Sequence, residues 1–382
     1  MSLSGEGAES EMQELTLNEN LLAAPVHVAG KPIEEVRREY GLERIVKLAS
    51  NENPLGPSPL AVEAIRKSLP NTHRYPGTVE ANLCARLAEL MGGDFDEDNI
   101  IIGNGSCDVL RMVCLAFLHH GGESVICPST FPMYRIYTQM FGGNLVPVEA
   151  RDYAYDLPAM VEKIGDATRL IFVCNPNNPT GTMLTQQQVD DFMERVPDGV
   201  VVVVDEAYYD YVADEHYASV KEYIEAGRNV IVTRTFSKIH GLAGLRVGYG
   251  VAKKEMIQYL QHARSPFHVG SVNLIGATAS LDDVEHIQRS RTLNAAEKEY
   301  LYEQFDRLDL RHIPSETNFI LLPELRHDAG AMSEALLRQG VIVRPAGGFG
   351  VPGAIRVTIG TREENERLVW ALEQVLHELA EG

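Results

Sequence analysis

Short runs of apolar, mostly β-branched residues alternate with amphipathic helical stretches between residues 100 and 235. The runs occupy residues 100–102, 124–127, 170–173, 200–204 and 229–232, and the helical stretches include 109–118 and 185–196. Strands that are apolar on both faces and separated by helices are typical of a mostly parallel sheet that is covered on both sides. The pattern therefore predicts an α/β fold for this part of the chain.

The pattern changes after about residue 281. A long charged helix is predicted over 282–307, shorter strands near 319–321, 341–343 and 355–357, and a terminal helix over 363–379. This order of helices and short strands predicts a smaller α+β domain at the C-terminus. We expect four parts: a disordered acidic N-terminus (1–15), a segment that packs on the small domain (16–49), a large domain (50–281) and the small domain (282–382).

Polar and glycine-rich segments follow the predicted strands of the large domain. They are residues 103–106, 128–131, 175–181, 205–208 and 235–238. Because sheets of this kind bind ligands at the carboxyl ends of their strands, we expect these segments to form one composite site.

The charge and the cysteines narrow the class of function. The 382 residues include 34 Lys and Arg against 54 Asp and Glu, which gives a formal net charge of −20. This charge argues against nucleic acid or an anionic membrane as a partner. The five cysteines form no CxxC pair, which indicates reduced thiols and neither disulfides nor a metal site. With no membrane-length apolar run and no signal pattern at the start, we expect a cytoplasmic protein.

Lys238 follows the last of the apolar runs, and Thr235, Ser237 and Arg246 lie close to it in the sequence. A lysine that is partly desolvated and near other cations has a lowered pKa, which frees its amine for Schiff-base formation. Hydroxyl groups and the guanidinium fork of arginine together suit a phosphate group. For an isolated lysine, however, the ordinary interpretation is an exposed loop residue.

A second anion-binding turn is predicted at residues 103–107, where glycines lead into the start of a helix. The free backbone N–H groups around Gly105 and Ser106 and the helix dipole favour a phosphate there. Many strand-to-helix turns look similar, so this signal is weak by itself.

Asp205 closes a run of five valines, where a carboxylate is costly without a cationic partner. A protonated ring nitrogen would be such a partner, and the pair would make the ring an electron sink. Tyr208 and Asn178 are candidates to hydrogen-bond the phenolic oxygen of the same ring, and Phe131 to stack on its face. The alternatives are a helix N-cap for Asp205 and core packing for Phe131.

The segments 175–181 and 205–208, together with Lys238 and Arg246, resemble the signature motifs of fold-type-I aminotransferases that use pyridoxal 5'-phosphate. More narrowly, the chain is similar to histidinol-phosphate aminotransferases in the segments 47–57, 74–76, 241–246 and 356–362. The resemblance implies the fold-type-I architecture, a large domain with a mostly parallel sheet and a smaller C-terminal domain. It also implies amino transfer between histidinol phosphate and 2-oxoglutarate in histidine biosynthesis.

The same resemblance implies roles for individual residues. Lys238 would bind the cofactor covalently and move the proton, Asp205 would pair with the ring nitrogen, and Tyr208 and Asn178 would hold the ring oxygen. Tyr75 would reach the cofactor phosphate from the partner subunit, which implies a homodimer with shared active sites. The residues implied around the phosphate within one chain are Gly105, Ser106, Cys107, Thr235, Ser237 and Arg246.

The resemblance also implies a substrate site. Arg356 would bind the carboxylate of the amino donor and Arg344 the phosphate of the substrate, with Asn53, Asn178 and His27 also near the substrate. Surface salt bridges are the alternative for both arginines.

Three residues depart from the pattern of the family. Cys107 stands where an acidic residue is usual, Phe131 where Tyr is common, and His27 where a Tyr often lies over the substrate. An aromatic amino-acid aminotransferase and a pyridoxal-phosphate decarboxylase of a phosphorylated amino acid therefore remain alternatives. A non-catalytic module that binds the cofactor is a further alternative, against which the acidic charge and the lack of a basic DNA-binding segment both argue.

Overall fold

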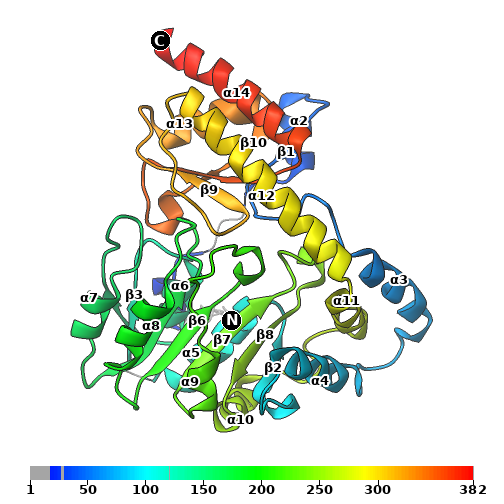
Figure 1. Ribbon diagram of the computed structural model, residues 1–382, viewed down its shortest axis with the longest axis vertical. Coiled ribbons are helices and arrows are strands. Elements are labelled where there is room, and N and C mark those ends of the chain that lie inside the picture. The colour runs from blue at the N-terminus through cyan, green and yellow to red at the C-terminus, as the bar shows by residue number, and fades with distance from the viewer. Residues whose placement is uncertain (1–17, 27–29, 120, 382) are drawn as a thin grey trace, which may run out of the picture.

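The computed structural model describes residues 18–26, 30–119 and 121–381. Residues 1–15, predicted to be disordered, and the candidate substrate residue His27 lie outside this range. Figure 1 shows a large sheet with its helices in the lower part and a smaller group of strands and helices above it. The division of the chain at residues 15, 49 and 281 stays a prediction.

The lower part is built on a seven-stranded sheet that is parallel except at one strand. In spatial order the strands are β2 (Ile100–Gly103), β8 (Gly248–Ala252), β7 (Val230–Thr235), β6 (Val201–Asp205), β5 (Thr168–Cys174), β3 (Glu123–Ile126) and β4 (Asn144–Pro147). Only β8 runs antiparallel to its neighbours β2 and β7. The mostly parallel sheet that the sequence predicts is therefore present.

The helices pack around the sheets of both parts of the molecule. They are α1 (Glu19–Ala23), α2 (Ile33–Tyr40), α3 (Pro59–Ser68), α4 (Val79–Met91), α5 (Ser106–Phe117), α6 (Met133–Met140), α7 (Leu157–Glu162), α8 (Gln186–Met193), α9 (Lys221–Glu225), α10 (Lys254–Ala263), α11 (Ser271–Leu281), α12 (Val284–Arg307), α13 (Ala329–Arg338) and α14 (Arg362–Glu381). Short 3-10 helices lie at Leu69–Asn71, Glu97–Asn99, Tyr209–Tyr211, Ala243–Leu245 and Gly347–Phe349. None of the helices in the described ranges is long and apolar enough to cross a membrane.

Alternate residues of a strand point to opposite faces of the sheet, and β6 shows what this means for the site. Val202 and Val204 pack together with apolar residues of α8. Asp205, on the other face, receives a hydrogen bond from the Tyr134 hydroxyl of α6. The apolar run of β6 thus places a carboxylate on the α6 side, at the carboxyl end of the sheet.

Strand β8 was not predicted, and its glycines explain both the omission and the packing. Gly248 lies against the start of α5, where an added Cβ would stand 2.2 Å from the backbone nitrogen of Ser106. Only glycine allows this close approach, and glycine also removes the apolar signal on which the prediction of a strand depends. The other unpredicted strand of this seven-stranded sheet, β4, lies at its edge and is only partly buried.

The upper part contains two small sheets. The antiparallel one, called the small sheet below, has the order β11 (Arg344–Pro345), β12 (Ile355–Thr358) and β9 (Phe319–Leu322). In the other, β1 (Val46–Lys47) pairs in parallel with β10 (Val341–Ile342). The N-terminal segment before residue 49 therefore contacts the C-terminal part of the chain.

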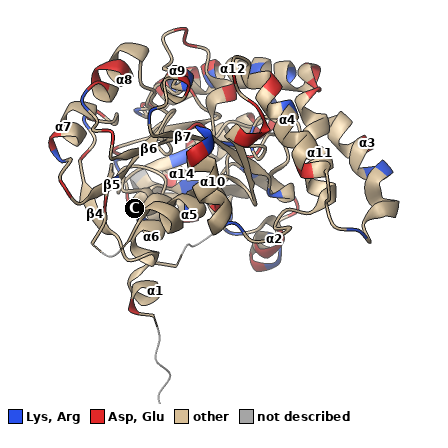
Figure 2. Ribbon diagram, turned by 90° about the horizontal axis from the view of Figure 1, so that it is seen from below, with Lys and Arg blue, Asp and Glu red and all other residues tan. Residues whose placement is uncertain are grey.

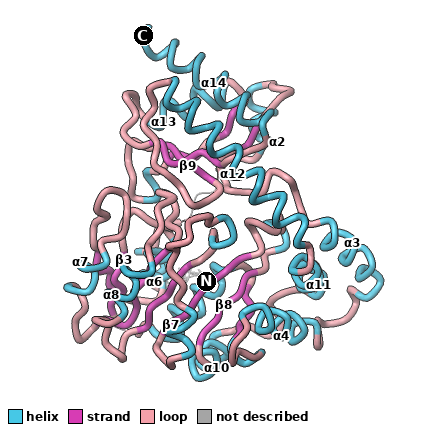
Figure 3. The backbone as a smooth tube through the Cα atoms, in the orientation of Figure 1, coloured by secondary structure: helices cyan, strands magenta, loops and turns pink. Residues whose placement is uncertain are grey.

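Helix α12 connects the two parts. Its N-cap, Asp283, accepts a hydrogen bond of 2.6 Å from Ser58 at the start of α3, whereas Phe305 near its other end is buried in the core of the upper part. Figure 3 shows the loops that lie between the two parts. Figure 2 shows acidic residues on α8 and both acidic and basic residues on α12.

Candidate active site

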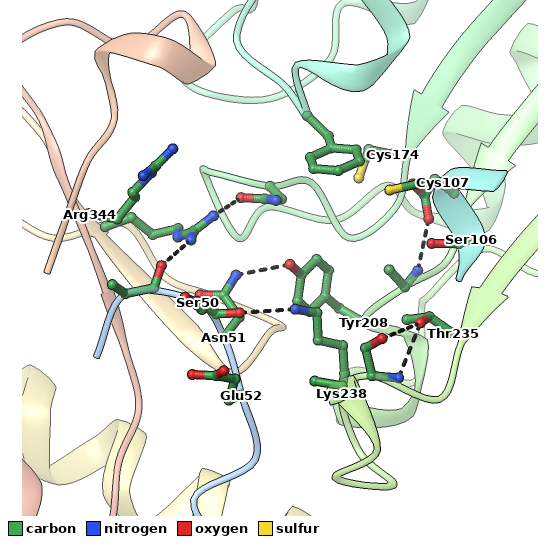
Figure 4. Close-up of a pocket in the computed structure, with 18 of the residues that line it drawn as sticks. Ser50, Asn51, Glu52, Ser106, Cys107, Cys174, Tyr208, Thr235, Lys238 and Arg344 are labelled. Atoms are coloured by element: carbon green, nitrogen blue, oxygen red, sulfur yellow. Dashed lines mark hydrogen bonds between the residues drawn. The ribbon is translucent and has the colours of Figure 1, made fainter. Parts of the chain in front are cut away.

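A cavity of about 310 Å³ lies where β5, β6 and β7 end and the small sheet begins (Figure 4). It brings together most of the residues that the sequence singled out. They are Ser106, Cys107, Phe131, Asn178, Asp205, Tyr208, Thr235, Ser237, Lys238, Arg246, Arg344 and Arg356. Gly105 lies directly behind this set, against the guanidinium group of Arg246.

Besides Gly105, two other described candidates, Tyr75 and Asn53, do not line the cavity. Tyr75 is 78% exposed and stacks on Phe267, with ring centroids 4.5 Å apart. The Asn53 amide donates to the backbone oxygen of Ile239 and to the Ser290 hydroxyl, both at 2.8 Å. Asn53 therefore holds the loop that follows Lys238, and its role as a substrate ligand stays a prediction.

Lys238 follows β7 and extends into the cavity toward Tyr208 (Figure 4). Its Nζ donates a hydrogen bond of 3.1 Å to the backbone oxygen of Ser50 and lies 5.6 Å from the centroid of the Tyr208 ring. Burial, with the nearby Arg356 guanidinium acting in the same direction, lowers the pKa of Lys238 to about 8. A neutral, nucleophilic amine is therefore accessible near neutral pH.

The hydroxyl groups predicted to bind a phosphate form a connected set. The Thr235 hydroxyl donates to the Ser237 hydroxyl at 3.0 Å, and Nη1 of Arg246 donates to the same Ser237 oxygen at 3.2 Å. Gly105 caps the start of α5 without a side-chain hydrogen bond, at a φ of 80° that favours glycine. The first N–H groups of α5 and the Arg246 guanidinium thus converge as donors for an anion.

Asp205 is buried on the floor of the cavity. Its carboxylate accepts hydrogen bonds from the Tyr134 hydroxyl at 2.8 Å and from the backbone N–H of Ala207 at 3.2 Å. Burial raises the pKa of Asp205 above its ordinary value, while both hydrogen bonds act in the opposite direction. A cation inside the cavity would hold this carboxylate in its charged form.

The small sheet contributes two arginines to the cavity. Strands β11 and β12 pair in a register that places Arg344 opposite Arg356, so that both residues stand on one face. Arg356 donates to Asn178 Oδ1 and, at 2.7 Å, to the backbone oxygen of Ala49, whereas its buried Nε has no partner among the described residues. Burial, with Arg344 acting in the same direction, lowers the pKa of Arg356 to about 10.

Among the residues of the site that were missed from the sequence, three bond directly to Lys238, Tyr208 or Asp205. Ser50 and Asn51 lie in the segment 47–57, whose resemblance to the family pointed to Asn53 instead. Tyr134 lies within α6 and stacks on Phe172 at 4.9 Å, and only the structure shows that its hydroxyl reaches Asp205.

Comparison with known proteins identifies the family. The family model for aminotransferase class I and II matches residues 43–372. The chain belongs to this aminotransferase family. It is 46% identical to a histidinol-phosphate aminotransferase from Moorella thermoacetica over 94% of this chain and 92% of that protein. A histidinol-phosphate aminotransferase from Brevibacillus brevis is 41% identical over 94% of this chain and 98% of its own.

Solved structures give the same fold for this aminotransferase. Histidinol-phosphate aminotransferase from Sinorhizobium meliloti in complex with pyridoxal-5'-phosphate matches with a TM-score of 0.86 and 26% identity, over 97% of this chain and all of that one. Aspartate aminotransferase from Thermus thermophilus with maleate, at 21% identity and a TM-score of 0.80, covers 94% of this chain and all of its own. The family and the fold class predicted from the sequence are both confirmed.

The first prediction concerns the amine of Lys238 in the ligand-free aminotransferase. We expect its reaction with trinitrobenzenesulfonate to follow a titration near pH 8. Replacement Arg356→Gln removes a neighbouring positive charge, which should raise this midpoint by about 0.5 to 1 unit. Peptide mass spectrometry across a pH series measures the rate of modification of Lys238.

Lys254, whose pKa is raised by its hydrogen bond to Asp96, serves as the control in the same digest. A wild-type midpoint above 10 would contradict the prediction.

Proposed function

We propose that this aminotransferase uses pyridoxal 5'-phosphate to move an amino group between histidinol phosphate and 2-oxoglutarate. The observation that carries the proposal is a buried lysine of lowered pKa that faces a buried carboxylate, beside two arginines of the small sheet. The relatives named histidinol-phosphate aminotransferase, at 41% and 46% identity over nearly whole chains, support this substrate.

The donors in the cavity suit the groups of the cofactor. An anionic phosphate fits the start of α5 together with Ser237 and Arg246, and a protonated ring nitrogen fits Asp205. Tyr208 and Asn178 would hold the ring oxygen, and Phe131 would lie against the ring. Cys107, whose pKa burial raises to about 11, stays a neutral thiol beside the phosphate site.

The reaction requires these residues to bind, orient and move a proton. When bound, the cofactor supplies a ring that withdraws electrons from the bond to be broken at the amino carbon of the substrate. Nζ of Lys238 would take the proton from that carbon and return it to the carbon of the cofactor that receives the amino group. Arg356 binds the carboxylate of the amino donor in one half-reaction, and Arg344 binds the substrate phosphate in the other.

We further propose that the enzyme is a cytoplasmic homodimer with shared active sites. Tyr75 and Phe267 are 78% and 58% exposed and stack on each other outside the cavity of their own chain. An exposed aromatic pair of this kind suits a protein interface. All five cysteines are free thiols, which suits a reducing compartment.

The central test is the replacement Lys238→Ala. We expect the variant to lose the visible absorption band of the bound cofactor and all measurable amino transfer, because Lys238 is the one lysine among the described residues that line the cavity. Absorption spectroscopy and a coupled assay measure the two effects, and Lys254→Ala is the matched control on the surface. If the variant kept a chromophore that borohydride reduces, Lys238 would not have the proposed role.

A second test addresses the substrate. Replacement Arg344→Gln should lower kcat/KM for histidinol phosphate about 10- to 100-fold, because a charge-assisted contact with phosphate is lost. The value for phenylalanine, which has no phosphate, should change less than about threefold. Arg338→Gln, on an exposed face of α13, is the control. Equal losses for both substrates would favour an aromatic aminotransferase, and release of carbon dioxide without amino transfer would favour a decarboxylase.

A third test asks whether Tyr75 acts across the dimer. Replacement Tyr75→Phe should weaken cofactor binding several-fold, because one hydrogen bond to phosphate is lost. A hybrid dimer with Lys238→Ala in one chain and Tyr75→Phe in the other then has one site with an intact lysine. That site should bind the cofactor with wild-type affinity if Tyr75 comes from the partner. Weakened binding in the hybrid would place Tyr75 in the site of its own chain.

A further inference from the structure

Strand β12 carries a second residue toward the cavity besides Arg356. Thr358 stands two positions after Arg356 and is therefore on the same face of the strand. It is 3% exposed, and its hydroxyl donates to Oδ1 of Asn51 at 2.9 Å and accepts from the backbone N–H of Asn51 at 2.9 Å. Thr358 thus both donates a hydrogen bond to Asn51 and accepts one from it.

This contact fixes the orientation of the Asn51 amide. Since Oδ1 of Asn51 accepts the Thr358 hydrogen, the amide presents its nitrogen to the other side, where Nδ2 donates to the Tyr208 hydroxyl at 2.9 Å. Asn51 is 1% exposed, and its φ of 56° lies in the left-handed region that few residues adopt. Asn318 holds its backbone oxygen with a hydrogen bond of 3.0 Å.

The chain of hydrogen bonds determines what Tyr208 can do. A tyrosine oxygen that accepts a hydrogen bond is a stronger donor through its own hydrogen, because the accepted bond withdraws charge from the oxygen. Asn51 lowers the pKa of Tyr208 in this way, against the larger effect of burial, which raises it. The Tyr208 hydrogen is then available to an acceptor in the cavity.

The other groups that face Tyr208 come from the surrounding elements. Arg356 of β12 lowers the pKa of Tyr208, whereas Cys174 of β5 and Asp205 of β6 raise it. Nζ of Lys238, after β7, lies over the ring at 5.6 Å. Asn51 is the uncharged member of this set that bonds directly to the hydroxyl.

We propose that Asn51 and Thr358 are positioning residues that direct the Tyr208 hydroxyl toward the ring oxygen of the cofactor. The proposal rests on the proposed function, because it requires bound pyridoxal 5'-phosphate. Under this proposal, strand β12 has two functions. It binds the substrate carboxylate through Arg356, and it orients Tyr208 through Thr358 and Asn51. The electronic state of the cofactor therefore depends on where this strand lies.

The pH titration of the visible band of the cofactor-loaded protein, without substrate, tests the proposal. A hydrogen bond donated to the ring oxygen stabilises negative charge there and so lowers the proton affinity of the bound cofactor. Thr358→Val keeps the shape of the side chain but frees the Asn51 amide to turn. We expect it to raise the titration midpoint by about 0.5 to 1 pH unit, as the loss of one hydrogen bond predicts.

Two further variants make the test specific. Thr358→Ser keeps the hydroxyl and should leave the midpoint within about 0.2 unit of the wild type, since the same hydrogen bonds remain. Asn51→Asp keeps the shape and the bond from Thr358 but removes the donor to Tyr208, so the midpoint should rise at least as far as in Thr358→Val. If Thr358→Val does not fold, Asn51→Asp replaces it in the test. Thermal unfolding of each variant without cofactor measures its stability separately.

The midpoints of the four variants distinguish a positioning role from a purely structural one. A shift in Tyr208→Phe, Thr358→Val and Asn51→Asp, absent in Thr358→Ser, supports the chain of hydrogen bonds. A shift in Tyr208→Phe without one in Thr358→Val and Asn51→Asp overturns it while leaving the proposed function intact. A wild-type protein that binds the cofactor without a visible band would instead overturn the proposed function itself, and the positioning role with it.

Discussion

The burial of one amine is the constraint on which the rest of this site depends. Lys238 extends into a cavity where desolvation and two guanidinium groups disfavour its charged form, whereas Glu52 and Cys107 act in the opposite direction. An ordinary surface lysine would remain protonated and unreactive at neutral pH. Burial would likewise make a charged Asp205 costly without a cation, so the amine and the carboxylate together suit the proposed ligand, which is both an electrophile and a base.

The segment of residues 49–53 connects this chemistry to the small sheet. Its backbone oxygens at Ala49 and Ser50 accept from Arg356 and Lys238, and Asn51 joins Thr358 to Tyr208. A five-residue stretch thus contacts Lys238, Arg356 and Tyr208, which the proposed function assigns to the nucleophile, the carboxylate ligand and the contact with the cofactor ring. The fold achieves this because β1, just before the segment, is held in the upper part by its pairing with β10.

The sequence allowed the large sheet and the residues at its strand ends to be predicted, because both follow from local signals. Asp205 comes directly after an apolar run, and Lys238 lies three residues beyond the end of β7, so their place at the carboxyl edge follows from the pattern of a parallel sheet. Contacts across the chain leave no such signal: Asn51 and Thr358 are 307 positions apart, and either is an ordinary polar residue in its own segment. Strand β8 was missed because its close packing on α5 requires glycine, the residue that weakens every strand prediction.

The two neighbouring acids at the end of β6, Asp205 and Glu206, have different partners. Glu206 points away from the cavity, where its carboxylate is buried and bonded to Arg234 at 2.7 Å, and the Arg234 guanidinium lies 3.9 Å from the centroid of the Tyr209 ring. Burial raises the pKa of Glu206, and the attraction of Arg234 opposes this effect. Asp205 points the other way, where its hydrogen-bond donors, Tyr134 and the Ala207 N–H, are both uncharged. The chain thus pairs Glu206 with an arginine of its own, whereas Asp205 has no ion pair among the described residues. A cationic ligand would balance the charge of Asp205, as the proposed function requires.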